Sequence, residues 1–78
     1  MADYSVKKVL DLKGLPCPMP VVRMSQEIGS VAVGEIIEVH TTDPGSLSDF
    51  PAWAKVQGHE IVEIKQGAFI QIFVKRLK

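Results

Sequence analysis

Two prolines that stand two residues apart, Pro18 and Pro20, restrict the fold of this chain more than any other feature of its sequence. A proline inside a helix or a central strand removes a backbone hydrogen bond, whereas the first turn of a helix has N–H groups without intrahelical partners. The apolar residues that follow have the spacing of one helix face: Val21, Met24 and Ile28. The sequence therefore predicts a helix that begins at Pro18 and stops at Gly29.

Four short apolar runs have the composition of β-strands. They span residues 6–12, 35–41, 59–65 and 68–75, and Gly14 follows the first of them. Gln66 and Gly67 are expected to form a tight turn, so that the last two strands make an antiparallel hairpin.

A second helix is expected after the second strand, with Asp43 as its N-cap and Pro44 in its first position. Pro51 is unfavourable inside a helix, so we expect either a kink there or a main helix that begins near Asp49. Gly58 is expected to end this helix.

The predicted order β-α-β-α-β-β is typical of an α/β (α+β) two-layer sandwich, with two helices on one face of a four-stranded mixed sheet. We expect a single domain over residues 1–78, because the chain is too short for two and 46% of its residues are apolar. A right-handed crossover places Cys17, at the start of the first helix, beside the carboxyl end of the first strand. Ligands tend to bind at that end of the strands in α/β sheets.

Charge and hydropathy argue against two classes of function. Nine Lys and Arg residues balance nine Asp and Glu residues, and zero net charge argues against direct binding of nucleic acid. No apolar stretch approaches the roughly 20 residues needed to span a bilayer, and Met1–Lys8 does not resemble a signal peptide. We therefore expect a cytoplasmic protein without membrane contact. The sequence has no Cys/His cluster, so we expect neither a metal site nor a cofactor.

Cys17 is the only cysteine, which excludes an internal disulfide and a Cys-x-x-Cys redox pair. It is either a buried packing residue or a reactive thiol, and its neighbours favour the reactive thiol. A helix N-terminus lowers the pKa of a cysteine from about 8.5 to roughly 3.5–7.5. The prolines fix the backbone, so the remaining amides, including that of Met19, are expected to be held in place. Lys13 and Arg23 are candidates for added positive potential.

Four further residues have both a structural and a functional interpretation. Asp43 is a candidate for orienting a partner or tuning the sulfur, although we favour the role of an N-cap. His59 is favoured as a partly exposed edge residue over a general base. Leu15 and Met19 flank Cys17 in sequence, and an exposed apolar rim there suits the docking of a partner protein.

The run from Leu12 to Val21 resembles the Gly-Leu-x-Cys-Pro-x-Pro signature of the TusA/SirA/YedF family of sulfur-carrier proteins. The matching residues are Gly14, Leu15, Cys17, Pro18 and Pro20, with Met19 between the prolines. The similarity continues through residues 34–35, 42–44, 49–53 and 58–59, so it covers nearly the whole chain. The resemblance implies the fold predicted above and a persulfide on Cys17.

The resemblance also implies partners. A cysteine desulfurase or a rhodanese donates sulfane sulfur, and a thiol protein such as a DsrE-like protein accepts it, in tRNA thiolation, dissimilatory sulfur oxidation or related sulfur trafficking. Met19 stands where the tRNA-thiolation members have Glu, which weakens that pathway. Such a protein is a carrier with sulfurtransferase-type chemistry rather than a full turnover enzyme. The alternative is a non-catalytic regulatory or RNA-associated interaction module.

Overall fold

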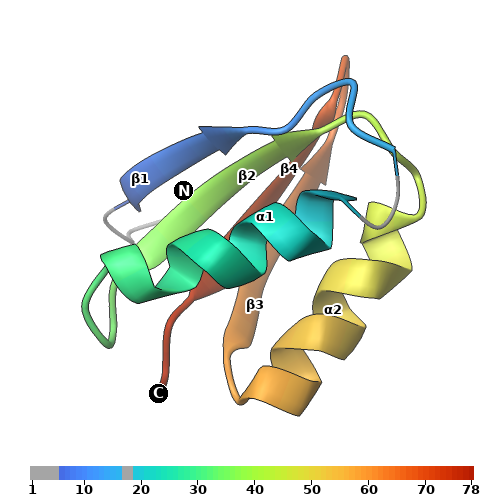
Figure 1. The fold of residues 1–78 in the computed structure, drawn as a ribbon. Coiled ribbons are helices and arrows are strands. Elements are labelled where there is room, and N and C mark those ends of the chain that lie inside the picture. The colour runs from blue at the N-terminus through green and yellow to red at the C-terminus, as the bar shows by residue number, and fades with distance from the viewer. Residues whose placement is uncertain (1–5, 17–18) are drawn as a thin grey trace.

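In the computed structural model, which describes residues 6–16 and 19–78, two helices cover one face of a four-stranded sheet (Figure 1). The elements are β1 (Val6–Asp11), α1 (Met19–Glu27), the 3-10 turn η1 (Ile28–Ser30), β2 (Ile36–Thr41), α2 (Ser46–Gln57), β3 (Glu60–Gln66) and β4 (Ile70–Lys75). The predicted element order and the two-layer α/β arrangement are confirmed. Cys17 and Pro18, where the first helix was predicted to begin, lie outside the described residues.

The sheet is mixed, with the strand order β1-β2-β4-β3. β1 and β2 are parallel and α1 joins them, whereas β4 is antiparallel to both β2 and β3. One register row crosses all four strands and faces the helices: Leu10, Val39, Ile72 and Ile64. Because side chains alternate along a strand, the next row points to the opposite, helix-free face. That row consists of Asp11, His40, Gln71 and Lys65.

The core lies between the helices and the sheet. Met24 of α1 and Phe50 of α2 are fully buried and pack in one cluster with Val39 and Ile72 of the sheet. Pro20 is also fully buried, so the first turn of α1 is anchored by a proline ring. No helix within residues 6–16 and 19–78 is long and apolar enough to cross a membrane.

The end of α1 differs from the prediction. The α-helix stops at Glu27 and continues as η1, so the prediction of a stop at Gly29 is wrong. Gly29 does not adopt the left-handed conformation of a glycine C-cap. The hydroxyl of Ser30 donates to the carbonyl of Glu27 at 2.6 Å, which satisfies one of the last carbonyls of the helix.

The start of α2 also differs from the prediction. Gly45 is the N-cap residue and Pro44 precedes the helix, so the prediction of Asp43 as N-cap is wrong. The carboxylate of Asp43 accepts a hydrogen bond from the N–H of Gly45 at 3.2 Å, and its carbonyl accepts one from Ser46 at 3.0 Å. Asp43 therefore closes a turn ahead of the helix, as Asp residues often do.

A single α2 runs through Pro51, so the alternative of a main helix that begins near Asp49 is wrong. Proline removes a helix hydrogen bond, but Phe50 and Ala54 on either side are buried, and this packing stabilises the segment. Gly58 ends the helix as predicted, with a φ of 81° and an N–H that donates to the carbonyl of Ala54 at 2.8 Å.

The β3–β4 hairpin has a longer connection than predicted. Gln66 pairs with Ile70, and the three residues from Gly67 to Phe69 make the turn, so the prediction of a tight turn at Gln66-Gly67 is wrong. The N–H of Gly67 donates to the carbonyl of Phe69 at 3.1 Å. The turn places the Phe69 ring 4.8 Å from the ring of His40 on β2, a contact that strand propensity does not predict.

Candidate functional site

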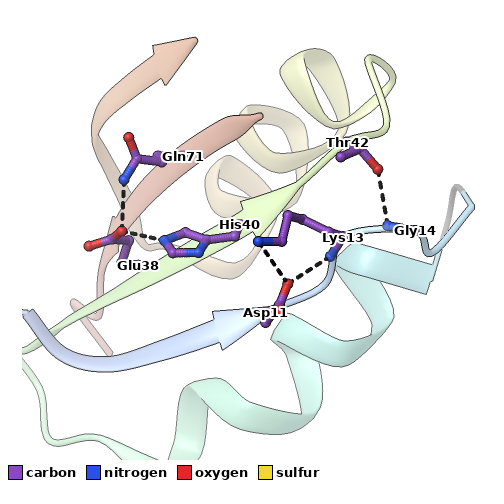
Figure 2. A network of polar contacts seen from close by, with 7 residues as sticks. All are labelled: Asp11, Lys13, Gly14, Glu38, His40, Thr42 and Gln71. Atoms are coloured by element: carbon purple, nitrogen blue, oxygen red, sulfur yellow. Dashed lines mark hydrogen bonds and ion pairs between the residues drawn. The ribbon is translucent and has the colours of Figure 1, made fainter. Parts of the chain in front are cut away.

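Two loops leave the sheet at the same end, because β1 and β2 are parallel neighbours. The 12–16 loop leads towards α1, and residues 42–45 lead to α2. The N–H of Leu12 donates to the carbonyl of His40 at 2.8 Å. The N–H of Gly14 donates to the hydroxyl of Thr42 at 3.0 Å (Figure 2). The loop that precedes Cys17 in sequence is therefore fixed to the end of β2.

The 12–16 loop has a local reason for its Gly-Leu pair. Gly14 has a φ of 85°, in the left-handed region that favours glycine. The N–H of Leu15 donates to the carbonyl of Leu12 at 3.3 Å and closes the turn. Leu12 is buried and Leu15 packs against the core. Glycine thus permits the turn and the two leucines anchor it.

The helix α1 begins at Met19, immediately after two residues that the structure does not describe. Cys17 and Pro18 lie outside the described residues, but Pro16 and Met19 on either side are described. The N–H of Met19 donates to the carbonyl of Pro16 at 2.8 Å, so this amide is held by the backbone. Met19 is 40% exposed, whereas Pro20 is fully buried. The first turn of α1 therefore presents a methionine to solvent and is anchored inside by a proline.

Lys13, a candidate for positive potential, is held on the helix-free face. Its ammonium lies 3.9 Å from the carboxylate of Asp11 and 4.6 Å from the centre of the Phe69 ring. The backbone N–H of Lys13 also donates to the carboxylate of Asp11, at 3.2 Å. The charge of Lys13 is thus shared with a carboxylate and an aromatic ring.

Arg23 and Asp43 occupy separate environments. Arg23 is exposed on α1, and after the hydrogen bond and charge of Lys8 its own charge helps to lower the pKa of Glu27. Asp43 is half-buried, and its Oδ2 is buried without a hydrogen-bond partner among the described residues. Within residues 6–16 and 19–78, no hydrogen bond or ion pair joins Lys13, Arg23 and Asp43, and no cluster of His, Cys, Asp and Glu could hold a metal ion.

A polar cluster on the helix-free face was not predicted. Glu38 accepts a hydrogen bond from the amide of Gln71 at 3.0 Å and pairs with Nε2 of His40 (Figure 2). Burial raises the pKa of Glu38, but the hydrogen bonds from His40 and Gln71 outweigh burial and hold that pKa below its usual value. The period-two spacing of Glu38 and His40 is the sequence signal that places them on one face. Their link to Phe69 depends on the hairpin and has no local signal.

Comparison with known proteins agrees with the fold and with the predicted family. The family described as sulfurtransferase TusA matches residues 8–76 of this chain. The sulfur carrier protein TusA of Allochromatium vinosum is 38% identical over 77 residues, which cover 97% of this chain and 99% of that protein. The Bacillus subtilis protein YrkI is 41% identical over 70 residues, or 88% of this chain and 93% of that protein. The solved SirA-like protein of Desulfitobacterium hafniense has the same fold, with a TM-score of 0.76 and 20% identity over 91% of this chain and 99% of that one.

Proposed function

The chain belongs to the TusA family of sulfurtransferases, and on that premise we propose that it is a sulfur carrier, which accepts sulfane sulfur as a persulfide on Cys17 and passes it to the thiol of a partner protein. The observation that carries the proposal is the fixed backbone on both sides of position 17. Before it, the 12–16 loop is tied to Thr42 through Gly14; after it, α1 begins at Met19. A thiol between two fixed segments meets its donor and its acceptor in a reproducible geometry.

The start of α1 supports a role for the thiolate form of Cys17. The first N–H groups of a helix have no intrahelical acceptor and form the positive end of the helix dipole. Pro20 has no N–H, and the N–H of Met19 is already bonded to Pro16. Stabilisation of a thiolate here therefore rests on the dipole and on the other amides of the first turn, with Lys13 and Arg23 as further candidates for positive potential.

The proposed transfer consists of two exchanges at sulfur. The Cys17 thiolate attacks the terminal sulfur of a donor persulfide, a new S–S bond forms, the donor S–S bond breaks, and the donor leaves as a thiolate. An acceptor thiolate then attacks the same sulfur, and Cys17 leaves as a thiolate. Each step replaces one S–S bond by another, so the relay needs no external oxidant or reductant. The carrier has to supply an accessible thiolate and a surface for its partners.

The surface beside the start of α1 suits protein partners. Met19 and Val22 lie three residues apart on α1, and their side chains are 40% and 39% exposed. An apolar patch beside a reactive group is typical of a docking surface. The donor in this proposal is a cysteine desulfurase or a rhodanese, and the acceptor is a thiol protein such as a DsrE-like protein, in a sulfur relay of the tRNA-thiolation or sulfur-oxidation type.

Intact mass measurement under non-reducing conditions tests the proposal. The purified protein is incubated with a cysteine desulfurase and cysteine, or with inorganic polysulfide, and then weighed. We expect an adduct of about 32 Da, the mass of one sulfur atom, on the wild type and none on Cys17→Ser. Circular dichroism should show both proteins folded. An adduct on Cys17→Ser, or none on the wild type with either donor, contradicts the proposal.

A further inference from the structure

The Phe69 ring packs against the His40 ring and also contacts the ammonium of Lys13 in the 12–16 loop. We propose that Phe69 and His40 are positioning residues, which hold this loop and thereby set the rate of sulfur uptake by Cys17. The inference rests on the proposed function. Neither residue belongs to the Cys-Pro-x-Pro motif, and Phe69 comes from the hairpin at the other end of the sequence.

The base of this arrangement is fixed within the sheet. Glu38 holds the His40 ring through Nε2 and is itself held by the Gln71 amide at 3.0 Å. The side chains of Glu38 and His40 are only 16% and 19% exposed, although they lie on the helix-free face. The His40 ring is therefore a fixed surface, and the Phe69 ring rests on it at 4.8 Å between centres, with 49° between the ring planes.

Lys13 connects this surface to the loop. Its side chain runs back from the loop towards His40 (Figure 2), and its ammonium lies 4.6 Å from the centre of the Phe69 ring. The next residue, Gly14, is bonded to Thr42. The cation–π contact thus holds the Lys13 side chain, in addition to the backbone hydrogen bonds that fix the loop at Leu12, Lys13 and Gly14. Loss of the Phe69 ring removes the aromatic part of this support.

Lys13 has two possible roles, as a positive charge or as a side chain that holds the loop. The two roles predict different effects on sulfur uptake when the Phe69 ring is lost, because Phe69 carries no charge. If Lys13 acts only as a positive charge, the loss of the ring leaves sulfur uptake unchanged. If Lys13 acts by holding the loop, Phe69→Leu slows uptake by about two- to fivefold, the size expected of one exposed cation–π contact. Phe69→Tyr keeps the ring and should restore the wild-type rate.

The helix-free face offers a matched control. The ammonium of Lys65 lies 5.5 Å from the centre of the Phe73 ring, in a second cation–π pair of the same face that does not involve the 12–16 loop. Lys65→Met removes a lysine from such a pair and should leave uptake unchanged. Lys13→Met removes the other lysine and should slow uptake as much as Phe69→Leu does.

The experiment measures the second-order rate of persulfide formation from polysulfide for each variant by intact mass. We expect slowing in Phe69→Leu and Lys13→Met, rescue in Phe69→Tyr, and no further loss when Lys13→Met is added to Phe69→Leu. A wild type that takes up no sulfur refutes the proposed function itself. A wild type that is loaded normally, together with Phe69→Leu at the wild-type rate or a full additional loss in the double variant, overturns this inference alone.

Discussion

The backbone N–H of Gly14 donates a hydrogen bond of 3.0 Å to the hydroxyl of Thr42, which lies 28 positions further along the chain. The bond forms because β1 and β2 are parallel neighbours, so the loops that follow them meet at one end of the sheet. It ties the segment before Cys17 to the segment before α2. A change at Thr42 therefore acts on the proposed sulfur site through the backbone.

Thr42→Val removes this hydroxyl and keeps the shape of the side chain. The Gly14 N–H is exposed and water replaces its partner, so the free energy of unfolding should fall by only about 0.5–1.5 kcal/mol. Sulfur uptake should slow, because the 12–16 loop gains freedom. Urea unfolding and uptake rates measure the two effects, with Thr42→Ser as the control that keeps the bond. A stability loss with unchanged uptake would separate Thr42 from the site.

Gly14→Ala tests the left-handed backbone of the loop. Gly14 has a φ of 85°, and this region costs a residue with a side chain about 1–2 kcal/mol. Gly29→Ala is a matched control, since an added Cβ meets no heavy atom within 4 Å at either position and only Gly14 has a positive φ. We expect Gly14→Ala to lower the free energy of unfolding and Gly29→Ala to leave it unchanged or raise it slightly. Equal effects would show that the conformation of Gly14 is not the cause.

The lowered pKa of Glu38 predicts that the folded protein loses stability in acid. Burial raises its pKa, but the hydrogen bonds from His40 and Gln71 lower it by more, so the folded protein binds fewer protons at this group than the unfolded chain. The contribution is complete above the ordinary glutamate pKa of about 4.3 and is lost as the pH falls through the lower pKa of the folded state. Urea unfolding between neutral and acid pH should give a flatter stability curve for Glu38→Gln. The exposed Glu60→Gln serves as the control, and an unchanged acid slope in Glu38→Gln refutes the prediction.

The hydrogen bond between His59 and Leu77 predicts that acid lowers the amide protection of the C-terminal residues. Burial, followed by the charges of Arg76 and Lys78, lowers the pKa of His59. Its Nδ1 accepts a hydrogen bond from the N–H of Leu77 at 3.2 Å, which requires that nitrogen to be unprotonated. Protonation of His59 is therefore less favourable in the folded protein than in the unfolded chain. The stabilisation that neutral His59 gives the folded state is present above the ordinary histidine pKa of about 6.5 and is lost as the pH falls through the lower pKa of the folded state.

Amide hydrogen exchange of Leu77, corrected for the intrinsic pH dependence, measures this effect. Protection should fall on acidification in the wild type and should be low at every pH in His59→Ala, which lacks the acceptor. Protection in the wild type that stays constant down to acid pH would contradict the role of His59.

Much of the fold follows from local patterns. The apolar spacing of Val21, Met24 and Ile28 predicts α1, and the β-branched runs predict the four strands, because these patterns match the faces that the elements bury. The ends of the elements were predicted less well. Composition favours Gly29 as a helix stop, but the hydroxyl of Ser30 caps the helix carbonyl of Glu27 instead.

The candidate site was predictable only where its residues are neighbours in sequence. The turn at Gly14 and the anchoring Leu15 belong to one motif, and their roles follow from local geometry. The hydrogen bond from Gly14 to Thr42 and the contact between Lys13 and Phe69 join segments that are far apart in the sequence. The sheet brings these segments together, so no local sequence pattern predicts the two contacts. The full burial of Pro20 is likewise a consequence of packing, which helix-start statistics do not reveal.

The most direct test of sulfur carriage is the discharge of the loaded protein. Wild-type protein is loaded, freed from excess donor by desalting and mixed with a thiol protein as acceptor, and both proteins are weighed intact over time. We expect that the adduct of about 32 Da leaves the carrier and appears on the acceptor in equal amount, while carrier without acceptor keeps its sulfur. An adduct that forms on Cys17 but stays there in the presence of acceptors from both proposed pathways would refute sulfur carriage, since a persulfide that is not passed on is only a modification of the protein.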